Sequence, residues 1–191
     1  MARSNKERTE ATRLALIEAA RRLFVEKGYA ETATPDIVAE AGVTRGALYH
    51  HFEDKKALFR ATLEREAQAV AAHIEAASPP AVSPRAALLS GAAAYFDAMA
   101  KPGRTRLLLL EAPAVLGFEN AGAIDRDNAE GTLMVGLSDL LGQDTNTARL
   151  EALTDLVSAA FDRAAIAIET GADRKVYEAA IASLLDGLVR A

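Results

Sequence analysis

The sequence predicts an all-α protein, and three observations support that fold class. Apolar residues recur every three or four positions through most of the 191 residues, which is the spacing of one helix face. Ala and Leu, both strong helix formers, dominate the composition. No stretch shows the alternating β-branched pattern of a strand. Half of the residues are hydrophobic, so the chain can bury a sizeable core.

The formal net charge of −5 is unevenly distributed. Residues 1–60 carry 11 Lys and Arg against 9 Asp and Glu, whereas the remainder carries 11 against 18. An acidic remainder limits nonspecific binding to DNA, while a local basic surface can still contact phosphates.

The composition also indicates a cellular compartment. Cysteine is absent, which excludes disulfides and fits a reducing environment. No apolar run approaches the ~20 residues that span a bilayer, and the first ten residues lack the apolar stretch of a signal peptide. We therefore expect a cytoplasmic protein that does not enter a membrane.

The first helix is expected over residues 9–27, after a polar arm at residues 1–8. Gly28 ends it, because glycine readily adopts the left-handed conformation that terminates helices. A second helix is expected over residues 34–41, with Thr34 as its cap and Pro35 in its first turn.

The third helix follows a short turn that begins at Gly42, and Thr44 is its expected cap. Leu48 and Phe52 lie four residues apart and therefore share the face that packs on the core. Asp54 is expected to cap a fourth helix.

The remaining helices are expected to form a second domain. Residues 78–84, which contain three prolines, read as a connection between the fourth and fifth helices. The expected helices cover residues 55–77, 85–99, 104–116, 123–141, 147–170 and 173–190. The predicted domains are residues 1–54 and residues 55–191.

Two helices joined by a short glycine-containing turn are typical of a helix-turn-helix unit, whose second helix enters the DNA major groove. Thr44 offers a hydroxyl, and Arg45 offers a fork of donors that fits the N7 and O6 acceptors of guanine or a phosphate. Gly46 lets the backbone approach closely. Tyr49 and His50 could donate to backbone oxygens of DNA.

Each of these residues alone is also compatible with an ordinary solvated helical hairpin. The combination is harder to explain in that way, because Gly46 costs a helix ~1 kcal/mol relative to Ala. Lys55, at the start of the next helix, completes the set as a candidate phosphate contact.

Residues 16–20, 23–24, 28–29 and 34–55 resemble the N-terminal domain of TetR-family (tetracycline-repressor-like) transcriptional regulators. Residues 41–52 with Asp54 and Lys55 match that family's motif nearly throughout. Residues 106–118 resemble a segment common in one group of TetR-like C-terminal domains. The resemblance implies an N-terminal helix-turn-helix domain and a C-terminal helical domain that dimerises and holds an inducer.

The resemblance also implies roles for individual positions. Thr44, Arg45 and Gly46 correspond to base-facing residues of the family. Its phosphate-contacting positions correspond to Thr34, Tyr49, His50 and Lys55. At position 35 some members carry a polar or basic DNA contact, and this chain carries Pro instead. The second helix is therefore expected to contact DNA mainly through Thr34 and its N-terminal dipole.

Apolar stripes on the last two helices are candidates for a homodimer interface. The family resemblance implies that the two helices pair with their twins, and a two-fold dimer reads palindromic half-sites ~34–36 Å apart. The alternative is an intramolecular core. The candidates are Leu153, Val157, Ala160, Ala164, Ile168, Tyr177, Ile181, Leu184 and Leu188.

Aromatic and other apolar residues in the middle of the chain are candidates to line a cavity for a small hydrophobic or amphiphilic inducer. A filled core is the alternative for each. The candidates are Tyr95, Phe96, Met99, Leu107, Leu110, Phe118, Met134 and Phe161. Glu111 and Asp162 interrupt apolar runs, where each either meets a cationic or hydroxylated ligand, pairs with an Arg, or lies at a solvated helix edge.

These features predict a transcriptional regulator that binds double-stranded operator DNA as a homodimer and is a repressor released by an inducer. A ligand-independent DNA-binding regulator and a helical protein-interaction adaptor are the alternatives. The three histidines are not spaced for a metal, and no phosphate loop or nucleophile motif is present. We therefore expect no enzyme activity, no cofactor and no metal.

Overall fold

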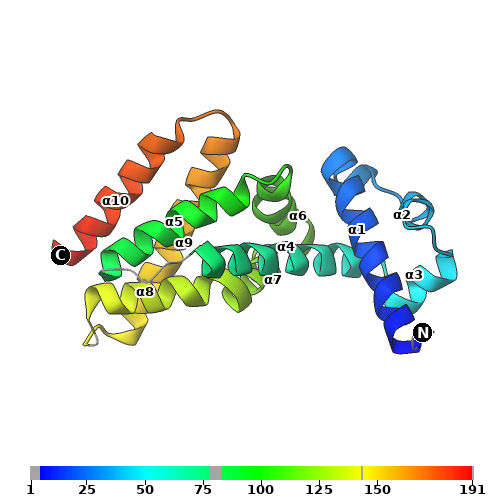
Figure 1. Cartoon of the computed structure of the whole chain (residues 1–191), viewed down its shortest axis with the longest axis horizontal. Coiled ribbons are helices and arrows are strands. Elements are labelled where there is room, and N and C mark those ends of the chain that lie inside the picture. The colour runs from blue at the N-terminus through cyan, green and yellow to red at the C-terminus, as the bar shows by residue number, and fades with distance from the viewer. Residues whose placement is uncertain (1–4, 78–82, 143, 191) are drawn as a thin grey trace. The chain divides into compact units, whose positions relative to one another are not determined.

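The computed structural model describes residues 5–77, 83–142 and 144–190 (Figure 1). Every regular element in these ranges is a helix, which confirms the predicted fold class. The α-helices are α1 (Asn5–Glu31), α2 (Thr34–Glu40), α3 (Arg45–His51), α4 (Lys55–Ala77), α5 (Pro84–Met99), α6 (Ala112–Leu116), α7 (Phe118–Asp125), α8 (Gly131–Leu141), α9 (Thr147–Glu169) and α10 (Arg174–Arg190). Two π-helical segments, η1 (Arg106–Glu111) and η2 (Arg126–Glu130), interrupt the series.

The chain folds into two units that are not continuous in sequence. The head unit consists of the residues up to Glu66 together with Arg106–Ala121. The body unit consists of Ala67–Thr105 together with the residues from Gly122 onward. The domain boundary predicted between residues 54 and 55 falls within the head unit, and it stays a prediction.

Most expected helix boundaries agree with the structure because the capping residues are local signals. The Thr44 hydroxyl accepts a hydrogen bond from the Ala47 amide at 3.1 Å, and the Asp54 carboxylate accepts one from the Ala57 amide at 2.7 Å. The expected cap at Thr34 is wrong, because Ala33 occupies that position and makes no side-chain cap bond. Thr34 is instead the first residue of α2.

The first helix differs from the expectation at its start and agrees with it at its end. Residues 5–8 are helical, so the expected polar arm does not extend to residue 8; residues 1–4 lie outside the described part. Gly28 has φ 82° and ψ 165°, which breaks α1 at the predicted position before the chain resumes a helical course to Glu31.

The core of the head unit is built from the inward faces of α1 to α4. Phe24 and Phe59 are fully buried and meet edge to face with ring centroids 5.0 Å apart. Ile37 and Leu48 fix α2 and α3 to the same core, and both are fully buried. The second and third helices are therefore held from behind by packing.

A segment from the second half of the sequence completes the head unit. Arg106 of η1 donates to the carbonyl oxygens of Phe24 and Val25 at 2.5 and 2.8 Å. Glu111 accepts a hydrogen bond from the Tyr29 amide at 3.0 Å and pairs with Arg106 at 3.2 Å. These two side chains satisfy backbone groups that the break at Gly28 deprives of helical partners.

The body unit is a bundle in which α5 packs against α8, α9 and α10. Arg85 of α5 forms a two-bond ion pair with Asp186 of α10 at 2.5 and 2.9 Å, and Arg174 of α10 reaches Asp97 of α5 at 2.5 Å. The helix expected over residues 123–141 is confirmed, but it begins earlier, at Phe118, and it contains the π-helical segment η2 between α7 and α8. The helix expected over residues 104–116 is also confirmed, and it contains the π-helical segment η1, which runs directly into α6.

Candidate nucleic-acid interface and ligand cavity

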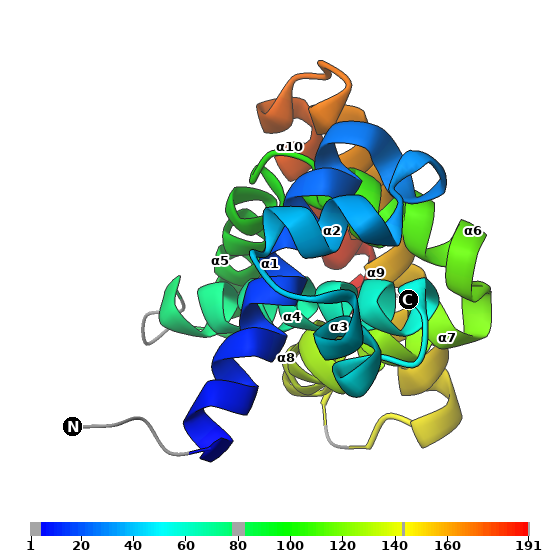
Figure 2. The same cartoon turned by 90° about the vertical axis from the view of Figure 1, so that its right-hand side faces the viewer.

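The third helix has one buried face and one exposed face, as its sequence pattern predicts. Leu48 is fully buried and Phe52 nearly so, and both anchor the helix to the head core. Gly46 and His50 are exposed on the other side. Figure 2 looks onto α2 and α3. The face presented to solvent therefore begins at the helix N-terminus, as a major-groove reader requires.

The turn between α2 and α3 is tightly ordered by its backbone. Gly42 takes the left-handed conformation with φ 65°, where a side chain would be strained. The Val43 amide donates to the Val38 carbonyl oxygen at 3.0 Å, and the Ala41 amide donates to that of Ile37 at 2.9 Å. This turn sets the angle at which α3 leaves α2.

Three of the predicted DNA contacts, Thr34, Arg45 and Tyr49, gather at one edge of the helix pair. Hydrogen bonds with Thr34 and with Arg45 lower the pKa of Tyr49 below its usual value. The Arg45 guanidinium carbon lies 5.5 Å from the Tyr49 ring centroid. The Tyr49 side chain is 45% exposed, so its hydroxyl remains accessible to a ligand.

Gly46 has no structural reason to be glycine. A Cβ added there would meet only the Thr44 hydroxyl oxygen, at an ordinary distance of 3.8 Å. Its backbone is helical, so alanine would be the more stable choice by up to ~1 kcal/mol. The missing side chain therefore leaves room for something outside the chain.

Lys55, predicted to contact phosphate, has a structural role in the head unit. Its ammonium donates to the carbonyl oxygens of Tyr29 and Thr32 at 2.8 and 2.9 Å and lies 4.3 Å from the centroid of the Tyr29 ring. These bonds hold the connection between α1 and α2. The sequence carried no signal for this role, because the acceptors are backbone atoms more than twenty residues away.

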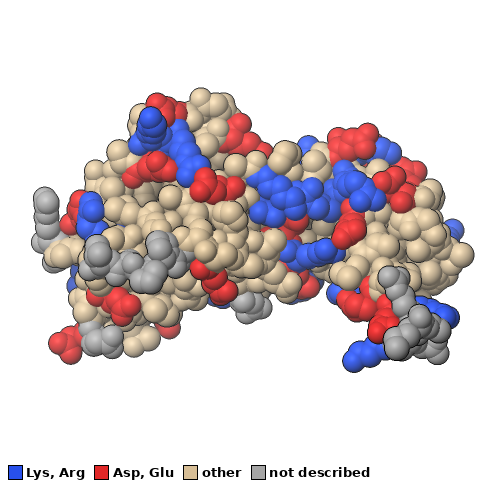
Figure 3. Space-filling view, in the orientation of Figure 1, with Lys and Arg blue, Asp and Glu red and all other residues tan. Residues whose placement is uncertain are grey.

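Charge on the surface is mixed. On the face that Figure 3 draws, Lys and Arg gather near the middle of the view, with Asp and Glu beside them and elsewhere on the face. Two ion pairs link α1 to α2, Arg22 with Glu40 at 2.8 Å and Lys27 with Asp36 at 3.1 Å.

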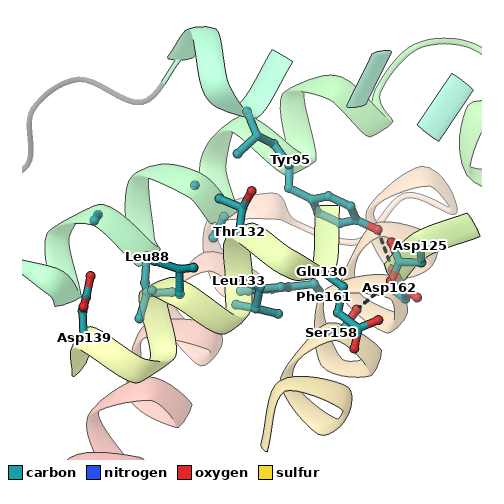
Figure 4. Close-up of a pocket in the computed structure, with 16 residues that line it drawn as sticks. Leu88, Tyr95, Asp125, Glu130, Thr132, Leu133, Asp139, Ser158, Phe161 and Asp162 are labelled. Atoms are coloured by element: carbon teal, nitrogen blue, oxygen red, sulfur yellow. Dashed lines mark hydrogen bonds between the residues drawn. The ribbon is translucent and has the colours of Figure 1, made fainter. Parts of the chain in front are cut away.

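A cavity of about 280 Å³ lies within the body unit (Figure 4). Its volume is close to the lower end of ordinary ligand sites, ~300 Å³. The apolar part of its lining consists of Ile74, Ala87, Leu88, Gly91, Ala92, Leu133, Val135, Gly136 and Phe161. The polar part consists of Tyr95, Asp125, Glu130, Thr132, Asp139, Ser158 and Asp162.

Only Tyr95 and Phe161 of the eight predicted lining residues line this cavity. Phe96 and Met99 are buried on the same helix but belong to the core of the body unit, and Met134 is flanked by two lining residues without being one. The other three lie in the head unit, where Leu107 is buried, Leu110 is exposed, and Phe118 is 85% exposed.

The cavity has a carboxylate-rich end that the sequence signalled only in part. The Tyr95 hydroxyl donates to Asp162 at 2.6 Å, and the Ser158 hydroxyl donates to Asp125 at 3.2 Å (Figure 4). Asp162 was singled out because it interrupts an apolar run. Asp125, Glu130 and Ser158 were missed, since nothing in the local sequence separates them from solvated helix positions.

Burial dominates the electrostatics of this end. It raises the pKa of Asp162 to about 6, with a further upward contribution from Asp125 and an opposing one from the Tyr95 hydrogen bond. Burial also raises the pKa of Asp125, against the Ser158 hydrogen bond and the charge of Arg126. The pKa of Tyr95 is raised well above its usual value by burial and by Asp162.

The predicted dimer stripes are turned partly inward. Val157, Ala164 and Ile181 are buried within the protomer itself, and Leu184 is exposed. The remaining members are half-buried: Leu153, Ala160, Ile168, Tyr177 and Leu188. The large apolar residues exposed on α9 and α10 are Leu156, Val176, Leu184 and Val189. We call these four residues the outer apolar face.

In residues 5–77, 83–142 and 144–190, no group of three or more His, Cys, Asp or Glu side chains is placed to hold a metal ion. Across the same ranges, no helix combines the length and the apolar character needed to cross a membrane.

Comparisons with known proteins cover both halves of the chain. The family model for bacterial regulatory proteins of the tetR family matches residues 16–62, and the model for the tetracyclin repressor-like C-terminal domain matches residues 85–191. The HTH-type transcriptional regulator TtgR of Pseudomonas putida is 48% identical over 64 residues, which cover 34% of this chain and 30% of that protein. The HTH-type transcriptional repressor BepR of Brucella suis is 43% identical over 63 residues, which cover 33% of this chain and 30% of that protein. The chain thus spans about a third of the length of these curated relatives.

Solved structures match over nearly the whole chain. A TetR-family transcriptional regulator from Pectobacterium atrosepticum is 30% identical, with a TM-score of 0.70 over 98% of this chain and 96% of that one. Another from Streptomyces coelicolor is 26% identical, with a TM-score of 0.74 over 94% of this chain and 80% of that one.

Proposed function

Since this chain belongs to the tetR family of bacterial regulatory proteins, we propose that it is a transcriptional regulator that binds a palindromic operator as a homodimer and is a repressor released by a small molecule. Such a regulator works in the cytoplasm, where bacterial DNA lies. The observation that carries the DNA-binding part is the exposed N-terminus of α3, where Gly46 leaves space that no packing contact of the chain requires.

The α2–α3 edge supplies two kinds of contact to DNA. Arg45 and Thr44 reach base edges in the major groove, with the arginine fork suited to guanine. Tyr49 and Thr34 donate to phosphates and fix the orientation without reading sequence. His50 is exposed on the same side of α3 and adds a further donor. Lys55 supports the interface mainly by holding the α1–α2 connection, although its third proton can still reach a phosphate.

The outer apolar face supports the homodimer. Leu156 is 65% exposed and Val176 is 62% exposed, and a second copy of the chain that covers such large apolar side chains removes them from water. In a two-fold dimer, α9 and α10 pair with the same two helices of a second copy of the chain. The same residues are then covered on both protomers.

The cavity supports release by a ligand because it is joined to the head unit through the chain itself. The head unit ends its second segment at Ala121, and Asp125 lines the cavity four residues later. A ligand that repositions Asp125 acts on a segment that Arg106 and Glu111 fasten to α1. A 100-fold release from the operator requires only ~2.7 kcal/mol of differential affinity.

A gel-shift titration with the DNA upstream of the gene tests the DNA-binding function. The Gly46→Ala variant tests whether the exposed N-terminus of α3 carries that function. The variant should be as stable as the unmodified protein or more stable, by up to ~1 kcal/mol, because alanine favours the helix. Its affinity for the operator should nevertheless fall at least tenfold, because the new methyl group occupies the space that the DNA backbone or a base edge needs.

Gly131→Ala is the matched control. Gly131 is an exposed helical glycine in the body unit, and an added Cβ there meets nothing within 4 Å. It should share any gain in stability and leave the operator affinity unchanged. Absence of sequence-selective retardation by the unmodified protein, or equal affinities of the Gly46→Ala variant and its control, would contradict the proposal and favour a protein-interaction adaptor.

A further inference from the structure

The cavity of the body unit has two chemically different ends (Figure 4). Leu88, Leu133 and Phe161 present an apolar surface along it. Asp125 and Asp162 lie together at the end where the Tyr95 hydroxyl points. An occupant that matches this lining has an apolar body and one polar end.

The residues that line the cavity determine which charge the polar end of the occupant carries. Four carboxylates, those of Asp125, Glu130, Asp139 and Asp162, line the cavity, and none of its described lining residues is Lys, Arg or His. The cavity is therefore electrostatically negative, and an anionic occupant would be repelled.

The two innermost carboxylates accept side-chain hydrogen bonds from neutral hydroxyl groups. Asp162 accepts from the Tyr95 hydroxyl and Asp125 from the Ser158 hydroxyl, and within the described residues no Lys or Arg forms an ion pair with either. The charge of Arg126 lowers the pKa of Asp125, but burial, which raises it, is the larger effect. Burying a carboxylate without a cation is costly, and a cationic ligand would remove that cost.

We propose that the cavity binds lipophilic monovalent organic cations, with the ammonium group between Asp125 and Asp162 and the apolar part against Leu88, Leu133 and Phe161. This inference rests on the proposed ligand-released regulator and names the class of its inducer. The Tyr95 ring adds a cation–π contact at the ammonium end. The cavity holds the volume of about nine water molecules at ~30 Å³ each, which suits a ligand of roughly ten heavy atoms.

Three probes that share one tail isolate the effect of charge. Isothermal titration of the purified full chain at pH 8 would compare 4-phenylbutylammonium, the neutral 4-phenylbutan-1-ol and the anionic 4-phenylbutyrate. The ammonium should bind at least tenfold more tightly than the alcohol, and the butyrate should bind most weakly. Equal binding of cation and alcohol, tighter binding of the anion, or no binding of the ammonium would overturn the proposal.

Substitutions identify the carboxylates responsible. Asp125→Asn and Asp162→Asn should each reduce ammonium affinity at least tenfold and leave alcohol affinity within about twofold, because asparagine keeps the shape and the hydrogen bond. Asp155→Asn is the matched control, since Asp155 is exposed on the same helix as Asp162 and lies outside the lining. A preference for the cation that persists in the Asp125→Asn, Asp162→Asn double variant would contradict the assignment.

A gel shift on the same preparations separates this inference from the proposed function. Tight, carboxylate-dependent binding of the ammonium by a protein that retards no DNA would support the ligand class and refute the regulator. Retardation of operator DNA by a protein that binds none of the probes would support the regulator and refute the ligand class. Release of the operator by the ammonium alone, lost in the Asp162→Asn variant, would support both.

Discussion

Replacing Asp162 by asparagine should make the protein more stable, and the gain should depend on pH. Burial raises the pKa of this carboxyl from 3.8 to about 6. A raised carboxyl pKa means that the folded state disfavours the charged form, so the wild-type protein loses stability as pH rises from about 4 to 6 and regains none above it. Asparagine cannot ionise, and its carbonyl oxygen can still accept the hydrogen bond from Tyr95.

The magnitude follows from the size of the pKa change. About two units at ~1.4 kcal/mol each correspond to a penalty of about 3 kcal/mol at pH 8 and ~1 kcal/mol at pH 4.5. For a chain of this length, 3 kcal/mol corresponds to a rise in Tm of roughly 6–12 °C. The groups that act on Asp162 are Tyr95 from α5 and Asp125 from α7. Arg126 in turn acts on Asp125, and Asp125 acts on Glu130 of η2.

The assay is urea unfolding followed by circular dichroism at pH 4.5 and pH 8, with protein concentration held constant because a dimer's stability depends on it. Asp155→Asn, exposed on the same helix, should change stability by no more than ~0.5 kcal/mol at either pH. A loss of stability for the Asp162→Asn variant at pH 8, or a gain of equal size at both pH values, would refute the reasoning. The first result would mean that the carboxylate is well compensated in the folded state.

Three other substitutions test the head unit and the outer apolar face. Lys55→Met should lower the free energy of unfolding by ~2–4 kcal/mol in urea titrations, because two charge-assisted hydrogen bonds to backbone carbonyls are lost; an unchanged value would return this lysine to a purely DNA-contacting role. Glu111→Ala should destabilise the protein by ~1–3 kcal/mol, since the Tyr29 amide loses its acceptor, whereas Glu111→Gln should recover about half of that loss; equal effects would show that only the Arg106 ion pair matters. Leu156→Glu should leave the helical circular dichroism unchanged and shift light scattering at micromolar concentration from dimer to monomer; a variant that stays dimeric would place the interface elsewhere.

Local signals made much of the head unit predictable from sequence. Thr44 and Asp54 cap their helices through hydrogen bonds to amides three residues away, and Leu48 is buried by the spacing that the sequence shows. Such contacts depend on residues within one turn. Thr34 was misassigned as a cap because Ala33, which has no side-chain acceptor, occupies the cap position in the structure.

The interior of the second half was less predictable because its helices are apolar on more than one face. Val157 and Leu156 are adjacent apolar residues on α9, yet Val157 is buried within the protomer and Leu156 is exposed. Only the packing of the bundle distinguishes them. The π-helical segment η2 could not be predicted either, since residues 123–141 contain no proline that would mark an irregularity in the helix.

The contacts of Arg106 and Glu111 have a practical bearing on protein engineering. A chimaera that grafts residues 1–66 of this chain onto the remainder of another regulator would leave the Tyr29 amide and the Phe24 and Val25 carbonyl groups facing foreign side chains. The transplanted DNA reader would then be misfitted at its rear surface even if every operator-contacting residue were retained. A successful graft must carry residues 106–121 as a second, non-adjacent insert.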